Sequence, residues 1–174
     1  MCNLSACKVL CLFTNLLFPP PPSSTLIPYT LVSTFLYQNH LSGPIPPVIG
    51  NLISLQFLYL YQNNLTGAIP KSLGNLTNLI DLELSDNQFN GSIPVSIGNL
   101  SNLEVLSLQN NQFSGSIPAT FGNLVELDFS FNQLSSSIPV SIGILRNLEL
   151  LYLGQNQFSG TIPQELGNLN KLVA

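Results

Sequence analysis

With 174 residues the chain is long enough for one domain with a sizeable core. Its 45% hydrophobic residues, 7% charged residues and net charge of −4 exclude a chain that is disordered because of its charge. Four basic residues and an isoelectric point near 4.5 exclude an electrostatic footprint for nucleic acid or for an anionic membrane. No apolar run approaches the roughly 18 residues that a membrane-spanning helix needs.

The cysteines carry little information about chemistry. Cys2, Cys7 and Cys11 all fall within the first eleven residues. An odd, clustered set does not form a disulfide framework, and a C-x3-C pair without a nearby histidine is a poor zinc site. We expect no metal and no cofactor.

A 24-residue repeat governs most of the chain. Three adjacent copies begin at Asn51, Asn75 and Asn99, and the third reads "NLSNLEVLSLQNNQFSGSIPATFG". Counted from the first leucine of each copy, leucine recurs at positions 1, 4, 7 and 9, asparagine at 12, and leucine or phenylalanine at 14. Glycine follows at 16, Ile-Pro at 18 and 19, and an apolar residue then glycine at 22 and 23.

The pattern within each copy predicts one short strand. The L-x-L at positions 7 to 9 alternates inward apolar and outward polar residues, as a half-buried strand does. One such strand cannot bury its own apolar side, but stacked copies form parallel strands about 4.8 Å apart over a shared core. The proline at position 19 should end strand pairing, and the glycine at 16 should permit a bend.

The asparagine at position 12 is predicted to be structural. Its side-chain amide can donate and accept at the same time, so it can pair backbone groups of neighbouring turns that would otherwise be buried without partners. The predicted ladder comprises Asn15, Asn39, Asn63, Asn87, Asn111, Asn132 and Asn156.

The start of the chain keeps the same frame in damaged form. The stretch "KVLCLFTNLLFPPPPSS", residues 8–24, has leucines at 10, 12 and 17, Asn15 and Pro22 where the period requires them. A secretory signal peptide is the alternative interpretation, although Thr14 and Asn15 interrupt its apolar region and no A-x-A cleavage site follows. We therefore expect a degenerate, poorly ordered region at residues 1–34 and a repeat array at residues 35–174.

Two further departures lie downstream. The copy that contains "FGNLVELDFSFNQLSSSIP" is three residues short after Asn123, and Ser136 replaces its turn glycine. The loss should shorten a convex loop and leave strand stacking intact. The last copy breaks off at "LNKLVA", and we expect no capping segments around the array.

The consensus L-x-x-L-x-x-L-x-L-x-x-N-x-L-x-G-x-I-P-x-x-L-G resembles the plant-specific class of leucine-rich repeats. The G-x-I-P element distinguishes this class, and the resemblance covers nearly the whole chain. It implies an α/β-type repeat solenoid, with a parallel sheet on the concave face and short 3₁₀ or irregular turns on the convex side.

Residues that flank the strand leucines should form the concave face, which such arrays use for binding. Five of the eight acidic residues fall there, beside several aromatic residues. The candidate binding residues are Phe35, Tyr37, Phe57, Tyr59, Tyr61, Asp81, Glu83, Asp86, Ser107, Gln109, Glu126, Asp128 and Tyr152. An aromatic patch beside an acidic strip suits a peptide or protein with basic and apolar groups. The alternative is that these residues only pair across strands.

The chain shows no sign of an enzyme. Asp81 and Glu83 point the same way on an open strand, with no expected cleft to shift a pKa, and His40 has no Ser or Cys partner. There is no phosphate loop, dinucleotide motif or kinase signature.

Five N-glycosylation motifs fit a protein of the secretory pathway, where glycans would occupy loops. The candidate asparagines are Asn3, Asn64, Asn75, Asn90 and Asn99. A glycan on Asn64 is expected at the concave edge.

The resemblance implies a recognition module from the ectodomain of a plant receptor-like kinase or receptor-like protein, acting in signalling or defence at the outer face of the plasma membrane or in the cell wall. Its partner would be a peptide, a protein or another leucine-rich-repeat co-receptor, with no nucleic acid. A soluble cell-wall inhibitor like those of polygalacturonase, or a truncated gene product without its own role, are the alternatives. Any kinase domain would belong to the parent protein.

Overall fold

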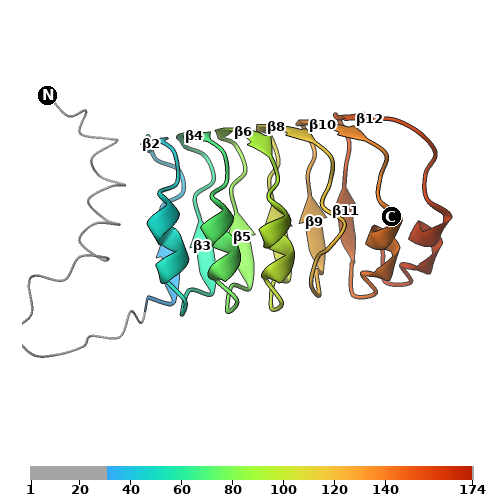
Figure 1. Cartoon of the computed structure of the whole chain (residues 1–174), viewed down its shortest axis with the longest axis horizontal. Helices are drawn as coiled ribbons and strands as arrows, with labels where there is room; N and C mark the ends of the chain where they lie inside the picture. Colours follow the sequence, from blue (N-terminus) through green and yellow to red (C-terminus); the bar gives the residue numbers. More distant parts are fainter. Residues whose placement is uncertain (1–30, 174) are drawn as a thin grey trace, which may run out of the picture.

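The computed structural model describes residues 31–173, which form a solenoid of stacked turns (Figure 1). The N-terminal residues 1–30, including Asn3, Asn15 and the three cysteines, lie outside the described residues, as does Ala174. Most turns contain a strand of a first sheet, a strand of a second sheet and a 3₁₀ helix. Within residues 31–173, no helix has the length and apolar character needed to cross a membrane.

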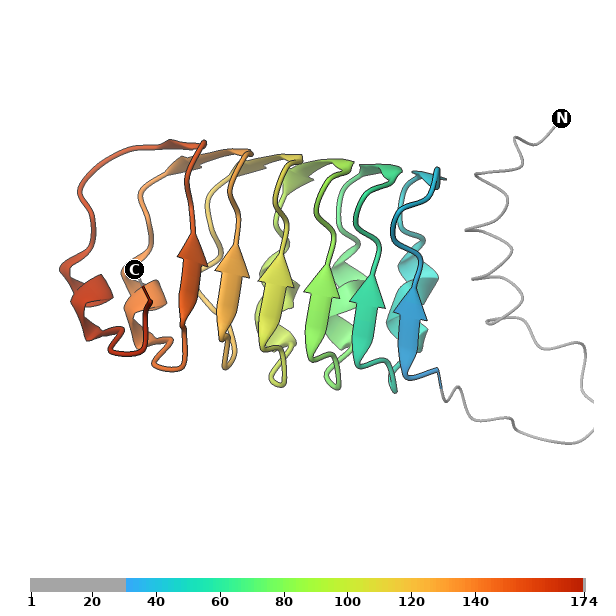
Figure 2. The ribbon, with the colours of Figure 1, turned by 180° about the vertical axis from the view of Figure 1, so that it is seen from behind.

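The first sheet has six parallel strands in sequence order (Figure 2). Their central leucines are in register, since Leu58 aligns with Leu82, Leu82 with Leu106, and Leu106 with Leu127, and all four are fully buried. The strands are β1 (Ser33–Phe35), β3 (Phe57–Tyr59), β5 (Asp81–Glu83), β7 (Val105–Ser107), β9 (Glu126–Asp128) and β11 (Leu150–Tyr152).

The first described strand, β1, starts two residues before residue 35, where we expected the regular array. Ser33 and Thr34 belong to β1 and align with Phe57 and Leu58 of β3. Thr34 occupies a position that leucine fills in the other described turns, and its hydroxyl is buried with no hydrogen-bond partner among the described residues. Burying this unpaired hydroxyl costs free energy, so the first described turn packs against the core less favourably than the turns that follow.

The asparagines at position 12 join successive turns. Asn111 accepts from the Phe89 N–H of the preceding turn at 3.0 Å. Its amide nitrogen donates to the carbonyls of Leu84, Leu108 and Gln109 at 3.0–3.2 Å. Asn63, Asn87, Asn132 and Asn156 make the same set of bonds, while Asn39 donates only within its own turn. Each of these asparagines except Asn39 thus satisfies four backbone groups from two turns.

A second six-stranded parallel sheet, which the repeat pattern did not predict, follows the asparagines. It runs β12-β10-β8-β6-β4-β2 along the edge of the solenoid at the top of Figure 1. Its strands are β2 (Ser42–Gly43), β4 (Asn64–Gly67), β6 (Gln88–Ser92), β8 (Gln112–Gly115), β10 (Gln133–Ser136) and β12 (Gln157–Phe158).

The glycine at position 16 serves this second sheet. Gly67, Gly91 and Gly115 adopt φ of +76° to +79°, a region that favours glycine. In the short turn Ser136 takes the same conformation, with φ of +69°. The second sheet therefore continues through the position where the glycine is missing.

The convex side is built from short 3₁₀ helices. They are η1 (Pro47–Asn51), η2 (Lys71–Asn75), η3 (Val95–Asn99), η4 (Val140–Ile144) and η5 (Gln164–Asn168). A Cβ at Gly74 would collide with the backbone of Ser96 in the next turn, which explains the glycine that closes each copy. The glycine therefore lets each 3₁₀ helix pack closely against the helix of the next turn, where that helix is present.

The three missing residues remove a helix and leave the strands aligned. No 3₁₀ helix lies between η3 and η4 in the described chain, yet β7 and β9 still pair in register, with Leu106 opposite Leu127. Phe121 packs against the core in place of the missing turn, its ring 6.0 Å from that of Phe129. The Ser141 hydroxyl beyond this gap is buried without a partner.

The ladder can be tested at the short turn. Replacing Asn132 with alanine leaves the buried Phe113 N–H and three carbonyls without their partner. We expect the free energy of unfolding to fall by about 2–4 kcal/mol. Gln133→Ala, at an exposed neighbouring position, should change it by less than about 0.5 kcal/mol. Urea unfolding measures both, and equal losses would contradict a structural role for the ladder.

Candidate functional site

The strand register arranges the predicted binding residues in two rows on the first sheet. One row contains Phe35, Tyr59, Glu83, Ser107, Asp128 and Tyr152. The other contains Phe57, Asp81 and Glu126, with Ser33, Val105 and Leu150 completing it. The structure therefore brings the aromatic and acidic candidates onto one surface of adjacent strands.

The remaining candidates lie just beyond the strands. Tyr37, Tyr61 and Gln109 occupy equivalent positions before the turn, and Asp86 accepts a hydrogen bond from Asn110 at 2.7 Å. His40 and Asn64 belong elsewhere, because Asn64 begins β4 of the second sheet and His40 precedes β2. Asn64 is therefore on the second sheet and not on the expected edge of the first.

Five side chains form what we call the aromatic patch: Phe35, Tyr37, Phe57, Tyr59 and Tyr61. The Tyr37 and Tyr61 rings stack nearly parallel, with centroids 4.6 Å apart. Tyr59 touches the rings of Phe35, Phe57 and Tyr61 at centroid distances of 5.0 to 6.5 Å. Because Phe35 is 56% exposed and Tyr37 is 39% exposed, the patch offers ring surface to a partner.

Four carboxyl groups on the adjoining strands form what we call the acidic strip: Asp81, Glu83, Glu126 and Asp128. The Tyr59 hydroxyl donates to Asp81 Oδ2 at 2.6 Å and so joins the strip to the aromatic patch. The other Asp81 oxygen is buried and has no protein donor. Asp128 accepts from the Ser130 N–H and hydroxyl at 2.8 and 2.6 Å.

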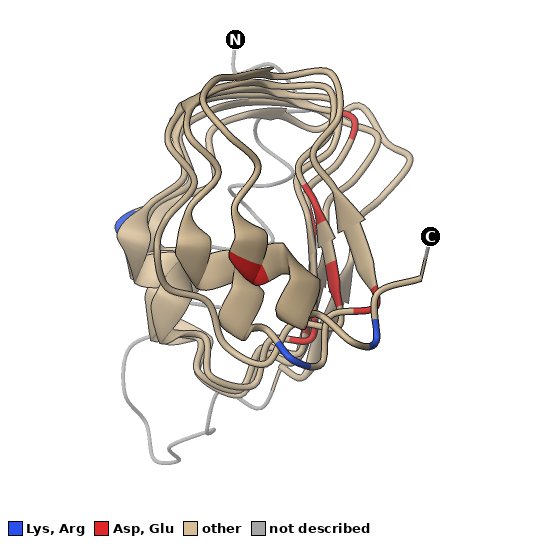
Figure 3. Cartoon of the chain, turned by 90° about the vertical axis from the view of Figure 1, so that its right-hand side faces the viewer, with Lys and Arg blue, Asp and Glu red and all other residues tan. Residues whose placement is uncertain are grey.

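Basic side chains do not neutralise the strip. Figure 3 shows acidic segments on the strands of the first sheet, with others on a helix and in loops, and basic segments only outside those strands. Among residues 31–173, Lys71 lies on η2, Arg146 follows η4, and Lys171 donates to Asn147 at 3.0 Å. The strip is therefore a surface of uncompensated negative charge.

Asp81, Glu83 and Glu126 hold their protons more tightly than free carboxyl groups do. Burial raises the pKa of Glu83 to about 7, and the charges of Asp81 and Glu126 add to that effect. Burial also raises the pKa of Asp81, although the hydrogen bond from Tyr59 opposes it. Burial and Asp128 raise the pKa of Glu126. The expectation that an open strand would leave these pKa values unshifted was wrong, because neighbouring strands bring carboxyl groups and rings together.

The arrangement is suited to binding. Exposed aromatic faces can stack on apolar or cationic groups, and the adjacent carboxylates can pair with arginine or lysine. In the described part of the chain no group of three or more histidine, cysteine or acidic residues is placed to hold a metal ion.

One exposed residue near this surface was missed from the sequence. Phe131 is 52% exposed and adopts φ of +54° in the turn after β9. The equivalent residues in other described turns are Gln38, Gln62, Asp86, Asn110 and Gln155, which are all polar. An aromatic residue at a position that is otherwise polar is the signal that identifies it.

Comparison with known proteins agrees with this architecture. A leucine-rich-repeat family model matches residues 53–113, and another matches residues 123–145 and 147–169. No match was found among curated protein sequences.

Solved structures of plant receptors are similar to the chain. The Arabidopsis thaliana receptor kinase GASSHO1/SCHENGEN3 ectodomain, in complex with CASPARIAN STRIP INTEGRITY FACTOR 2, is 36% identical with a TM-score of 0.79, over 83% of this chain and 18% of that one. The Arabidopsis HAESA ectodomain, in complex with an IDA peptide hormone, is 41% identical with a TM-score of 0.79, over 82% and 24%. A chain of the Arabidopsis BIR3–SERK2 complex is 31% identical with a TM-score of 0.67, over 80% and 75%.

The fold is that of a plant receptor ectodomain built from leucine-rich repeats. The chain belongs to the leucine-rich-repeat family, and within it to the plant receptor-like proteins. It spans about a fifth to a quarter of the length of the GASSHO1/SCHENGEN3 and HAESA ectodomains.

The raised pKa values predict how stability depends on pH. The folded protein binds more protons than the unfolded chain between the usual glutamate pKa of 4.5 and about 7, so the free energy of unfolding should fall as pH rises through this window. Glu83→Gln should remove part of this fall, on the order of 1 kcal/mol, since the carboxyl group is partly solvated. Urea unfolding at a series of pH values measures the slope.

Glu149→Gln provides the matched control, because Glu149 is exposed on the segment before β11. The same slope in Glu83→Gln and in the unmodified chain would contradict the assignment. So would a stability that rises with pH across this window.

Proposed function

We propose that the chain is a non-catalytic recognition module of a plant receptor-like kinase or receptor-like protein ectodomain, and that it binds a peptide or protein through the first sheet. The observation that carries this proposal is the aromatic patch joined to the uncompensated acidic strip on adjacent strands. The similar HAESA ectodomain was solved with a peptide hormone ligand, and that of GASSHO1/SCHENGEN3 with CASPARIAN STRIP INTEGRITY FACTOR 2, which supports this class of partner.

The chemistry of the surface defines the ligand. Glu83 and Asp128 lie in the same row with only Ser107 between them, and Asp81 and Glu126 lie likewise with only Val105 between them. An arginine or lysine side chain can therefore lie between pairs of carboxylates, while a neighbouring apolar residue rests on Tyr37 and Tyr61. The ligand we propose carries a basic residue next to an aromatic or aliphatic one.

The surface is extended rather than enclosed, which favours an extended peptide or a protein partner over a small molecule. A chain of the BIR3–SERK2 complex has the same fold, so a second leucine-rich-repeat protein is a further partner of this class. In this proposal the module acts outside the plasma membrane or in the cell wall, as receptor ectodomains do.

Selection from a random peptide library displayed on phage tests the proposal with the full 174-residue chain as bait. We expect the selected peptides to carry arginine or lysine beside an aromatic or aliphatic residue. Tyr61→Ala and Glu126→Gln should each weaken their binding about tenfold, which corresponds to about 1.4 kcal/mol. Calorimetry measures the change.

Two variants serve as controls. Gln112→Ala and Gln133→Ala change the exposed first residues of β8 and β10 in the second sheet. Both should bind the selected peptides as the unmodified chain does. Peptides without basic residues, or equal losses in all four variants, would overturn the proposed surface.

A further inference from the structure

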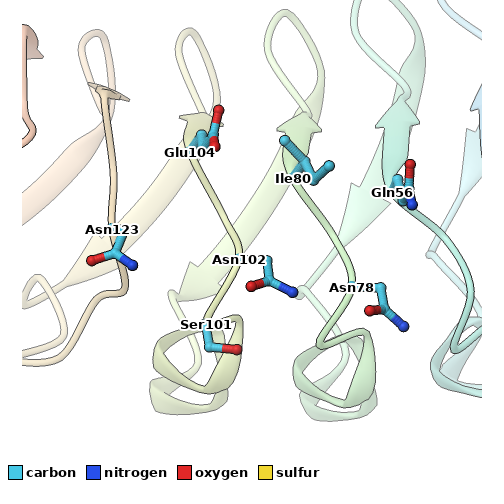
Figure 4. A pocket seen from close by; sticks show the side chains of 7 residues that line it. All are labelled: Gln56, Asn78, Ile80, Ser101, Asn102, Glu104 and Asn123. Carbon is cyan, nitrogen blue, oxygen red and sulfur yellow. The ribbon is translucent and has the colours of Figure 1, made fainter.

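A shallow polar recess of about 300 Å³ lies apart from the two rows of the first sheet (Figure 4). It is lined by Gln56, Asn78, Ile80, Ser101, Asn102, Glu104 and Asn123. Gln56, Ile80 and Glu104 each immediately precede a strand of the first sheet, so the recess follows the edge where successive turns enter that sheet. Neither the repeat pattern nor the proposed function assigns a role to it.

The recess lies where a second asparagine ladder stops. Asn78 donates to the Ile53 carbonyl at 2.8 Å, and Asn102 donates to the Thr77 carbonyl at 3.0 Å. The next turn is the short one, and its Asn123 stands at the equivalent position, four residues before the strand leucine, but makes no hydrogen bond to the Ser101 carbonyl. Among the described residues, nothing donates to the Ser101 carbonyl.

The lining has the chemistry of a carbohydrate site. The side chains of Gln56, Ser101, Glu104 and Asn123 make no hydrogen bond to other described residues, and Asn102 uses only its amide nitrogen. Amides, a hydroxyl and a carboxylate together supply donors and acceptors that match the hydroxyl and acetamido groups of a sugar. Ile80 provides an apolar contact for the C–H face of a sugar ring.

A ready source of such a sugar lies beside the recess. Asn99 is exposed at the end of η3, and Asn99-Leu100-Ser101 is an N-glycosylation motif. Its hydroxyl residue, Ser101, is itself part of the recess lining. Two residues span at most about 7 Å, so a glycan on Asn99 starts next to the recess.

We propose that an N-linked glycan on Asn99 folds back into this recess, with its first N-acetylglucosamine units seated among Gln56, Asn102 and Glu104. The glycan then covers the recess and shields the Ser101 carbonyl. The inference rests on the proposed function in one respect, which is that the chain enters the secretory pathway. It does not depend on peptide binding to the first sheet.

Asn75 is the matched comparison within the chain. It is exposed at the end of η2, in the motif Asn75-Leu76-Thr77, at the position equivalent to Asn99 one turn earlier. The following turn there is complete: Asn102 donates to the Thr77 carbonyl, and η3 packs against η2. A glycan on Asn75 therefore starts beside a carbonyl that is already paired, whereas the Ser101 carbonyl beside Asn99 is not.

The test uses the full chain secreted from plant cells, with mass spectrometry to record which asparagines carry glycans. Native digestion with an endoglycosidase should release the Asn99 glycan on the order of tenfold more slowly than the Asn75 glycan. Glu104→Gln and Gln56→Ala should each speed release at Asn99 and leave release at Asn75 unchanged. Asn99→Gln should lower the melting temperature more than Asn75→Gln does.

Three results would overturn the inference. They are the absence of a glycan on Asn99, equal release rates at the two sites, and a release rate at Asn99 that neither Glu104→Gln nor Gln56→Ala changes. The release rates keep the inference testable even if Asn99→Gln folds poorly. Failure of the proposed function would appear separately, as loss of peptide selectivity with the slow release at Asn99 retained.

Discussion

The structure depends on how each turn pairs its backbone with the turn before it. Parallel strands of three residues bury little by themselves, and the chain leaves each first-sheet strand through a left-handed residue where the strand conformation ends. The buried asparagine that follows satisfies four backbone groups and links two turns at this point. Stacking in register is therefore the low-energy arrangement, and it fixes which side chains share a row.

That constraint explains the charge of the first sheet. Residues separated by one full turn stand next to each other, so Asp81 and Glu83 face the strands that carry Tyr59 and Ser107. The side chains keep this spacing because the strands cannot move apart without breaking the ladder. Burial in this arrangement raises the pKa of Glu83 to about 7, and the charges of Asp81 and Glu126 add to the effect. The carboxyl groups of the strip favour a basic partner.

Much of this architecture could be predicted from the repeat, because Leu58, Leu82 and Leu106 follow a strict period and the short turn loses only convex residues. The second sheet could not be predicted, since its strands lie in Gly- and Pro-rich segments without an alternating apolar pattern. Ser136 adopts a φ of +69°, which is typical of glycine, and no local motif predicts this conformation. The recess is lined by residues of several successive turns, and the pKa shifts arise from burial and from charged neighbours, some of them on other strands, so the pattern of a single repeat predicts neither.

The central claim is that one continuous first sheet runs through the short turn and unites the aromatic patch with the acidic strip. Native-state amide hydrogen exchange tests this most directly. The Leu84 N–H donates to the Ser107 carbonyl of β7 at 2.9 Å, and the Leu108 N–H donates to the Asp128 carbonyl of β9 at 2.8 Å; only the second bond enters the short turn. We predict similar protection for both amides. Fast exchange at Leu108 with strong protection at Leu84 would contradict the account, because the first sheet would then be divided and Glu126 and Asp128 would not share a surface with Asp81 and Glu83.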